Sequence, residues 1–267
     1  MTEKLLFRIL SALIGIPIIF GVVVSGPHSL LMFCCLVTTL GHLEISRLLT
    51  RVNVNLAIPL SLLFSIVIVT NGYFGNQFLL EIICSSLVVS GILFLRKPLV
   101  ASSLSESLAT FATPFVLGIP FSLILIIRAM DGGVSWIIFI LLVTFGTDSS
   151  AFFVGKIIGR TPMAKSISPS KTLEGAFGGL LASLILGILW GCLSSLELPL
   201  WQAALFGFTL GVSGQIGDLI ESAFKRAVEV KDSGSIIPGH GGVLDRVDSI
   251  ALNIVVAYYL IMLFRLI

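Results

Sequence analysis

Charged side chains are scarce in this 267-residue sequence: they make up 11% of the residues, while 56% are hydrophobic. A soluble globular domain usually has an apolar share of about 45–50%, and the mean hydropathy here is +1.10. The composition therefore excludes an ordinary soluble domain and indicates a membrane protein. The net charge of +2 says little about partners, because the placement of charges matters more than their sum in a membrane chain. We expect no nucleic-acid partner.

Other absences narrow the function. The four cysteines fall inside apolar stretches and lack metal-ligand spacing, so we interpret them as small core hydrophobes. The GxxxxGK[ST] spacing of a Walker loop is missing, and no convincing internal repeat of the transporter type is present. The apolar segment 5–26 lacks a convincing small-residue cleavage site, so we interpret it as an uncleaved first span.

Long hydrophobic runs fill most of the chain. Stretches of about 20 apolar residues, enough to cross about 30 Å of hydrocarbon, recur along nearly the whole length and leave no room for a separate soluble domain. We predict an all-α fold, an integral membrane helical bundle of about nine transmembrane helices. The predicted spans are 5–26, 29–46, 56–73, 77–95, 108–128, 134–155, 173–195, 198–219 and 247–267.

The distribution of basic residues predicts an orientation. Nine spans place the two termini on opposite sides, and cytoplasmic loops of membrane proteins are enriched in lysine and arginine. With the N-terminus in the cytoplasm, 14 of the 16 basic residues are cytoplasmic, and only Arg128 and Arg265 are not. The chain is thus predicted to lie in the cytoplasmic (inner) membrane, with cytoplasmic loops at 156–172 and 222–246.

Polar residues divide the chain into two regions. The first five spans are nearly uncharged inside, so we expect 1–130 to form N-terminal scaffold helices and 131–267 to form the catalytic region. His42 and Glu44, near the cytoplasmic end of the second span, are either within reach of the active region or interfacial side chains. We expect the interfacial role.

A polar segment precedes the seventh span, with the sequence SPSKTLEGAFGG at 168–179. We expect an irregular loop, followed by a helix with Thr172 as its N-cap and Glu174 in its first turn, where a carboxylate suits the helix dipole. Lys171 lies beside the positive end of this helix, whose free amides favour anions. Ordinary helix initiation and a phosphate site are equally good interpretations of this segment.

A second polar concentration surrounds the last cytoplasmic loop. Asp218, Ser222 and Lys225 have i, i+4, i+7 spacing and share one helix face, and Asp245 and Asp248 are three residues apart at the start of the last span. A charge at a helix centre costs about 2.5–3.5 kcal/mol on insertion scales, and close carboxylates also repel. Either salt bridges to nearby basic side chains or a metal ion supplies the missing positive charge.

The donor types favour one metal over another. Only one histidine and no cysteine lie near Asp218, Asp245 and Asp248, and an all-oxygen environment suits Mg²⁺ better than zinc. His240 lies within PGHGG, where glycines allow backbone amides to turn toward a phosphate. We interpret this string as an anion cradle.

The stretch from 144 to 250 resembles the phosphatidate cytidylyltransferases, also called CDP-diacylglycerol synthases. The segments that carry the resemblance are Asp148 to Gly155, SPSKTLEGAFGG, and a long C-terminal signature. The signature consists of Ser222, Lys225, Arg226, Lys231, Asp232, Pro238, His240, Gly241, Gly242, Asp245, Arg246 and Asp248.

The resemblance implies a reaction and its partners. It implies that CTP and phosphatidate, a membrane lipid, react at the cytoplasmic membrane surface to give CDP-diacylglycerol and pyrophosphate for phospholipid biosynthesis. Mg²⁺ is the expected cofactor, and a second cation and a homodimer are left open.

The resemblance also implies roles for individual residues. Asp218 and Asp245 are the expected metal ligands. The expected catalytic residues are Lys171, Ser222, Lys225, Arg226 and Asp248. The expected substrate-binding residues are Asp148, Ser168, Thr172, Lys231, Asp232, His240, Gly241, Gly242 and Arg246.

Two other functions remain as alternatives. A CTP-dependent kinase of a membrane isoprenoid alcohol would also bind CTP, but would transfer the γ-phosphoryl group and release CDP. An ion-coupled transporter would also carry acids within its spans, although such acids tend to lie at the bilayer midplane rather than at one surface.

Overall fold

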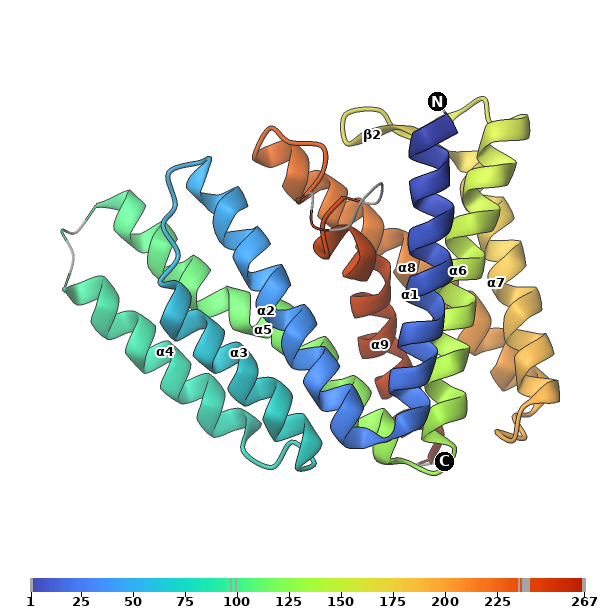
Figure 1. The fold of residues 1–267 in the computed structure, drawn as a ribbon, viewed down its shortest axis with the longest axis horizontal. Coiled ribbons are helices and arrows are strands. Elements are labelled where there is room, and N and C mark those ends of the chain that lie inside the picture. Colours follow the sequence, from blue (N-terminus) through green and yellow to red (C-terminus); the bar gives the residue numbers. More distant parts are fainter. Residues whose placement is uncertain (1, 97, 99, 235, 237–240, 266–267) are drawn as a thin grey trace. The chain divides into compact units, whose positions relative to one another are not determined.

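The computed structural model describes residues 2–96, 98, 100–234, 236 and 241–265. Over this part of the chain it contains nine helices and one two-stranded sheet (Figure 1). The helices correspond in order to the nine predicted segments. The chain forms two compact units, one of Met1–Ala129 with Val228–Asp245 and the other of Met130–Ala227 with Arg246–Ile267. The predicted functional division at 130 stays a prediction.

The first unit is built from five apolar helices. Proline occupies the first turn of both α2 and α3, where its missing N–H breaks no helical hydrogen bond. The helices of this unit are α1 (Thr2–Ser25), α2 (Pro27–Thr50), α3 (Ile58–Tyr73), α4 (Leu79–Leu95) and α5 (Ala101–Ala129).

Helix α5 packs against α2, α3 and α4. At Gly72 of α3, a Cβ atom would lie 2.4 Å from the backbone oxygen of Ser122 in α5. Only glycine allows the two backbones to approach this closely. Around this contact, Ile68, Val69 and Ile127 are fully buried, so apolar packing between α3 and α5 forms the centre of the unit.

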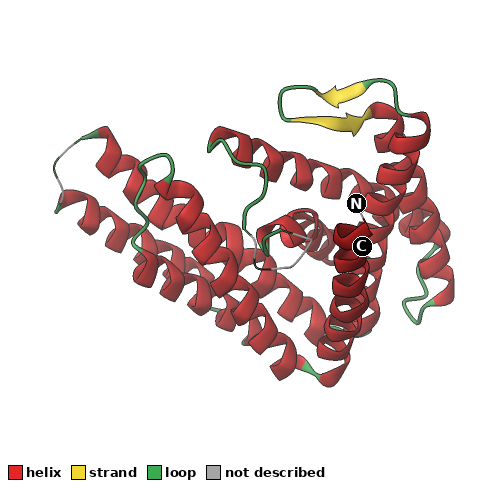
Figure 2. Ribbon diagram, turned by 45° about the horizontal axis from the view of Figure 1, so that its top comes forward, coloured by secondary structure: helices red, strands yellow, loops and turns green. Residues whose placement is uncertain are grey.

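The second unit contains four helices and a short sheet. Its elements are α6 (Gly133–Ile158), β1 (Pro162–Ala164), β2 (Ser168–Thr172), α7 (Leu173–Leu193), α8 (Leu200–Ala227) and, from Arg246 onward, α9 (Leu244–Arg265). Strands β1 and β2 pair antiparallel (Figure 2). The expectation of an irregular loop before α7 was therefore wrong: these short polar strands lack the apolar alternation by which a strand is recognised in sequence.

Buried aromatic and polar contacts hold the second unit together. Trp136 and Phe206 have ring centroids 5.0 Å apart. Asn253 of α9 accepts a hydrogen bond from Ser213 Oγ of α8 at 2.5 Å and donates one to Thr144 Oγ1 of α6 at 2.7 Å. These buried polar groups have their hydrogen bonds satisfied, and they fix α9 against α6 and α8.

The all-α, polytopic membrane class is confirmed. Six helices of the described chain are long and apolar enough to cross a membrane: Pro27–Thr50, Ala101–Ala129, Gly133–Ile158, Leu173–Leu193, Leu200–Ala227 and Leu244–Phe264. Three shorter apolar helices cover Leu13–Ser25, Ile58–Tyr73 and Leu79–Leu95. The number of spans, nine, stays a prediction.

Candidate active site

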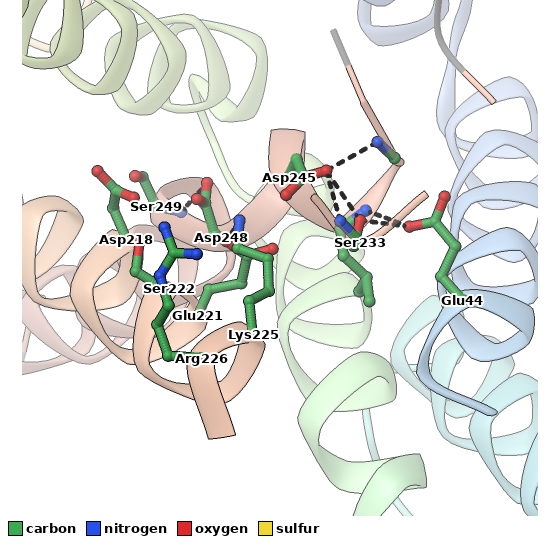
Figure 3. A network of polar contacts seen from close by, with 12 residues as sticks. Glu44, Asp218, Glu221, Ser222, Lys225, Arg226, Ser233, Asp245, Asp248 and Ser249 are labelled. Carbon is green, nitrogen blue, oxygen red and sulfur yellow. Dashed lines mark hydrogen bonds and ion pairs between the residues drawn. The ribbon is translucent and has the colours of Figure 1, made fainter. Parts of the chain in front are cut away.

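Three carboxylates gather where α8 and α9 meet in the second unit (Figure 3). Asp218, Glu221 and Asp248 each offer an oxygen, and these oxygens all lie within 4.8 Å of one another. Asp218 and Glu221 are three residues apart and so share a face of α8. A Cβ atom on Gly217 would lie 2.7 Å from the backbone oxygen of Asp248, so the glycine permits the close approach that brings the acids together.

Two lysines lie beside this acidic group. Lys171 Nζ, carried by β2, is 2.8 Å from Asp218 Oδ1 and donates a hydrogen bond to Ser222 Oγ at 3.4 Å. Lys225 Nζ is 2.5 Å from Glu221 Oε2, one helical turn away on α8. The side chains of Lys171 and Asp218 are 25% and 34% exposed, so this ion pair is not enclosed in the protein interior.

Asp148 and Arg246 belong to the same charged surroundings. Asp148 of α6 interacts electrostatically with Asp218, Asp248, Lys171 and Arg246. The second unit therefore gathers acids and bases from α6, β2, α8 and α9, and the sequence predicted all five of these residues as site residues.

The start of α7 positions the end of the hairpin. Thr172 Oγ1 accepts a hydrogen bond from the backbone N–H of Gly175 at 3.1 Å, which confirms the predicted N-cap. Glu174 is in the first turn as predicted, and its carboxylate accepts hydrogen bonds from the backbone N–H groups of Arg160 and Thr161 at 3.1 Å. Both ends of the hairpin are thus tied to α7.

The hairpin also contacts α8. Arg226 Nε donates a hydrogen bond to the backbone oxygen of Ile167 at 3.1 Å, between the two strands. Ser168 pairs with Ala164 across the sheet. These contacts help to hold β2 where Lys171 reaches α8. Substrate binding by Ser168 and Thr172 stays a prediction.

Part of the signature lies in the first unit. Lys231 and Asp232 are exposed. Asp245, in the first turn of α9, accepts two hydrogen bonds through Oδ2, from Ser233 N at 3.0 Å and from Gly242 N at 2.8 Å, and Ser233 Oγ also lies 3.0 Å from this oxygen (Figure 3). This carboxylate therefore binds the segment that precedes α9.

Glu44 contacts the same segment. Its side chain is fully buried, and it accepts hydrogen bonds from Val243 N at 2.9 Å, Leu244 N at 3.0 Å and Ser233 Oγ at 2.9 Å. His42 is fully buried as well. The expectation of interfacial side chains at both positions was wrong, because both side chains lie in the protein interior, where His42 Nδ1 is 3.3 Å from Ser65 Oγ.

The predicted site residues are thus divided between the units. The second unit holds Asp148, Ser168, Lys171, Thr172, Asp218, Ser222, Lys225, Arg226, Arg246 and Asp248, and the first holds Lys231, Asp232, Gly241, Gly242 and Asp245. Pro238 and His240 lie outside the described residues. The prediction that Asp218 and Asp245 share a metal ion stays a prediction. Sequence reasoning missed Glu221, although its position three residues after Asp218 is a visible signal.

The acidic group of the second unit fits a hard divalent cation. An octahedral Mg²⁺ shell with bonds of about 2.1 Å places its oxygens about 3 to 4.2 Å apart, and the oxygens of Asp218, Glu221 and Asp248 lie within 4.8 Å of one another. Small side-chain adjustments would close the difference. Carboxylate oxygens are also the ligands that suit Mg²⁺, whereas softer metals favour nitrogen or sulfur ligands.

Comparisons with known proteins give a consistent result. A model described as "Cytidylyltransferase family" matches residues 6–264. The phosphatidate cytidylyltransferase of Helicobacter pylori is 34% identical over 253 residues, 93% of this chain and 90% of that protein. The enzyme of that name from Staphylococcus haemolyticus is 31% identical over 246 residues, 91% and 93% of the two chains. A third, from Bacillus subtilis, is 42% identical over 149 residues, 55% of each chain.

Proposed function

The chain belongs to the cytidylyltransferase family, and we propose that it transfers the cytidylyl group of CTP to phosphatidate, giving CDP-diacylglycerol and pyrophosphate. The protein is an enzyme of the membrane. Relatives that share nearly the full length and are named phosphatidate cytidylyltransferase support the choice of substrates. The observation that carries the proposal is the group of three carboxylates with Lys171 beside it.

The proposed reaction exchanges one phosphoric anhydride bond for another. An oxygen of the phosphatidate phosphate attacks the α-phosphorus of CTP. The bond from that phosphorus to the oxygen bridging to the β-phosphorus breaks, and pyrophosphate leaves with the electron pair. A phosphate monoester has a second pKa of about 6, so phosphatidate is mostly dianionic at neutral pH and needs little general-base assistance. We propose no covalent enzyme intermediate.

Charge repulsion is the main obstacle to this reaction. Two like charges 4 Å apart repel by about 4 kcal/mol at an effective dielectric of 20, and both substrates carry several negative charges. The proposed role of Lys171, Lys225 and Arg226 is to bind phosphate oxygens and reduce this repulsion. Lys171 is suited to this role because its ammonium group is partly exposed while Asp218 and Ser222 hold it in place.

We propose that Asp218, Glu221 and Asp248 hold Mg²⁺, with Asp245 kept as a predicted further ligand. When bound, the cation would neutralise phosphate charge and stabilise departing pyrophosphate. The carboxylates would orient and retain it: Lys171 and Lys225 pair with two of the three acids, and the mutual proximity of all three still favours an added cation.

The remaining predicted site residues are proposed to bind substrate. Four of them lie at the hairpin or within the charged group of the second unit: Asp148, Ser168, Thr172 and Arg246. The others are Lys231, Asp232, His240, Gly241 and Gly242. Glycine-rich backbone of this kind can turn amides toward phosphate.

We propose that the N-terminus and the site face the cytoplasm across the inner membrane. The basic-residue distribution supports this orientation. Single cysteines at Ser166 and Ser195, both exposed, in a cysteine-free background test it. The cysteine at 166 should react only with a cytoplasmic reagent and the one at 195 only with an external reagent; the reverse pattern would overturn the orientation.

Product identification tests the proposed reaction. The purified protein is incubated with CTP, phosphatidate and Mg²⁺, and nucleotide and lipid products are analysed. Formation of CDP-diacylglycerol and pyrophosphate in equal amounts is the expected result. Release of CDP with phosphorylation of an added isoprenoid alcohol would instead identify a CTP-dependent kinase, and no turnover of either kind would reject the proposal.

A further inference from the structure

Glu44 joins helix α2 to a segment far along the chain. Its hydrogen-bond partners Ser233, Val243 and Leu244 lie 189 to 200 residues later in sequence. The side chain is fully buried. Burying a carboxylate is costly unless hydrogen bonds compensate for lost water, so these contacts explain how a charged residue is accommodated here.

The contacts are directed at a helix start. Leu244 is the first residue of α9, and the first N–H groups of a helix have no partner within it. Glu44 accepts from Leu244 N and from Val243 N just before it. A carboxylate near a helix N-terminus is also favoured by the helix dipole. Glu44 therefore acts as a cap for α9 that is supplied by another helix.

The surrounding chain encloses the carboxylate closely. A Cβ atom on Gly242 would lie 2.4 Å from Glu44 Oε2, and one on Gly234 would lie 2.7 Å from Oε1. Ser233 Oγ lies 2.9 Å from Glu44 Oε2 and 3.0 Å from Asp245 Oδ2. The same hydroxyl thus contacts Glu44 and a signature carboxylate.

We propose that Glu44 is a positioning residue for the signature segment, by which we mean Gly241 to Asp245. It holds the start of α9 and Ser233 in place. Ser233 in turn contacts Asp245, which accepts a hydrogen bond from Gly242 N. This inference rests on the proposed function, in which Gly241 and Gly242 bind substrate, and it takes that substrate to be the phosphates of CTP. Its consequence is that the N-terminal helices do more than support the catalytic region: α2 supplies a residue that shapes the substrate site.

Glu44→Gln tests the inference with little change in volume. Both Glu44 oxygens accept hydrogen bonds from N–H groups, so an amide must place its own NH₂ against one of these donors. Glu106→Gln is the matched control, because Glu106 also lies in the first unit and accepts a backbone hydrogen bond, from Asn55 N at 3.2 Å. Its contact is exposed and involves the chain after α2 rather than the signature segment.

Two readouts separate positioning from general stability. Amide hydrogen exchange at 243 and 244 should accelerate about tenfold in Glu44→Gln, in line with loss of hydrogen bonds to a charged acceptor. The KM for CTP should rise by about tenfold with the protein still folded, whereas a purely structural defect would lower the active fraction and leave KM unchanged. Glu106→Gln should match the wild type in both measurements.

Each possible result of these measurements either supports or overturns the proposed role of Glu44. Unchanged exchange at 243 and 244, or an unchanged KM for CTP, would overturn the inference. If Glu44→Gln does not accumulate as folded protein, Ser233→Ala decides by the same readouts: smaller shifts in the same direction support the inference, and no shift overturns it. If the wild type makes no CDP-lipid, the proposed function fails, while the exchange measurement still tests whether Glu44 holds the segment.

Discussion

Two groups of acids in this protein have opposite surroundings. In the first unit, Glu44 and Asp245 accept hydrogen bonds from backbone N–H groups, and one serine hydroxyl lies within hydrogen-bond distance of both. In the second unit, Asp218 and Glu221 form ion pairs with lysines and lie close to Asp248. The first kind of carboxylate is held by neutral donors, and the second kind has lysine partners and like-charged neighbours.

The two environments distinguish acids that position the chain from acids that bind a ligand. Neutral amide donors fix a carboxylate without requiring any further ion, because each hydrogen bond is directional and internal. Crowded carboxylates repel and favour an added cation. Asp245 and Asp248 are only three residues apart on α9, yet the contacts of Asp245 are with the preceding segment and Asp248 belongs to the acidic group. Sequence spacing alone does not distinguish the two roles.

The largest effect is expected in the acidic group. Asp218→Asn or Asp248→Asn removes a charged oxygen from the proposed Mg²⁺ site, so activity should fall by about 10²–10³-fold, and the residual rate should require more Mg²⁺. Thermal stability should largely persist, because removing one of several close negative charges relieves repulsion. A Mg²⁺ titration of the initial rate, with thermal unfolding measured in parallel, checks both effects.

Glu197→Gln is a suitable control for these variants, since Glu197 is an exposed acid of the second unit outside the site. It should behave as the wild type. A destabilised Asp218→Asn protein with normal Mg²⁺ dependence would show instead that Asp218 is a structural partner of Lys171.

A somewhat smaller effect is expected at Lys171. Lys171→Ala removes the ammonium group beside Asp218, and turnover should fall by about 10²-fold if it binds substrate phosphate. Thermal stability should change little, because partly exposed ion pairs contribute about 0–1 kcal/mol. Lys171→Arg keeps the charge in a different shape and should recover part of the activity. Activity of the alanine variant within a few-fold of wild type would reduce Lys171 to a surface charge.

The smallest of these effects is expected at Asp245. Asp245→Asn can keep an oxygen acceptor for Ser233 N and Gly242 N while removing the negative charge. Activity should fall by about tenfold, with a raised Mg²⁺ requirement if the predicted ligand role is correct. Initial rates across a Mg²⁺ titration measure this. An unchanged Mg²⁺ requirement would remove Asp245 from the metal site and leave its contacts with the preceding segment as its role.

Short-range patterns in the sequence predicted much of the fold and part of the site. Apolar runs of membrane-spanning length indicated nine helices, and the described chain contains nine. Spacing within α8 placed Asp218, Ser222 and Lys225 on one face, and residue chemistry identified Thr172 as an N-cap, which the structure confirms. All of these follow from interactions within one helix or at its end, which short sequence windows contain.

The rest depends on contacts that no short window contains. Glu44 binds residues about 200 positions later, and no residue pattern within α2 predicts that contact. The β1–β2 hairpin is held by Glu174 and Arg226 rather than by an apolar face. Glu221 was overlooked although its spacing from Asp218 was visible, because only its approach to Asp248 reveals it as part of an acidic group.

Direct binding of Mn²⁺, a substitute for Mg²⁺ that electron paramagnetic resonance detects, tests the central claim without any substrate. Wild-type protein and Glu197→Gln should bind the ion equally, whereas Asp218→Asn and Asp248→Asn should bind it at least about tenfold more weakly, as expected for loss of a ligand when even outer-shell changes cost about 10–100-fold. Wild-type affinity in both aspartate variants would contradict the account, because the acids where α8 and α9 meet would then not be the cation site.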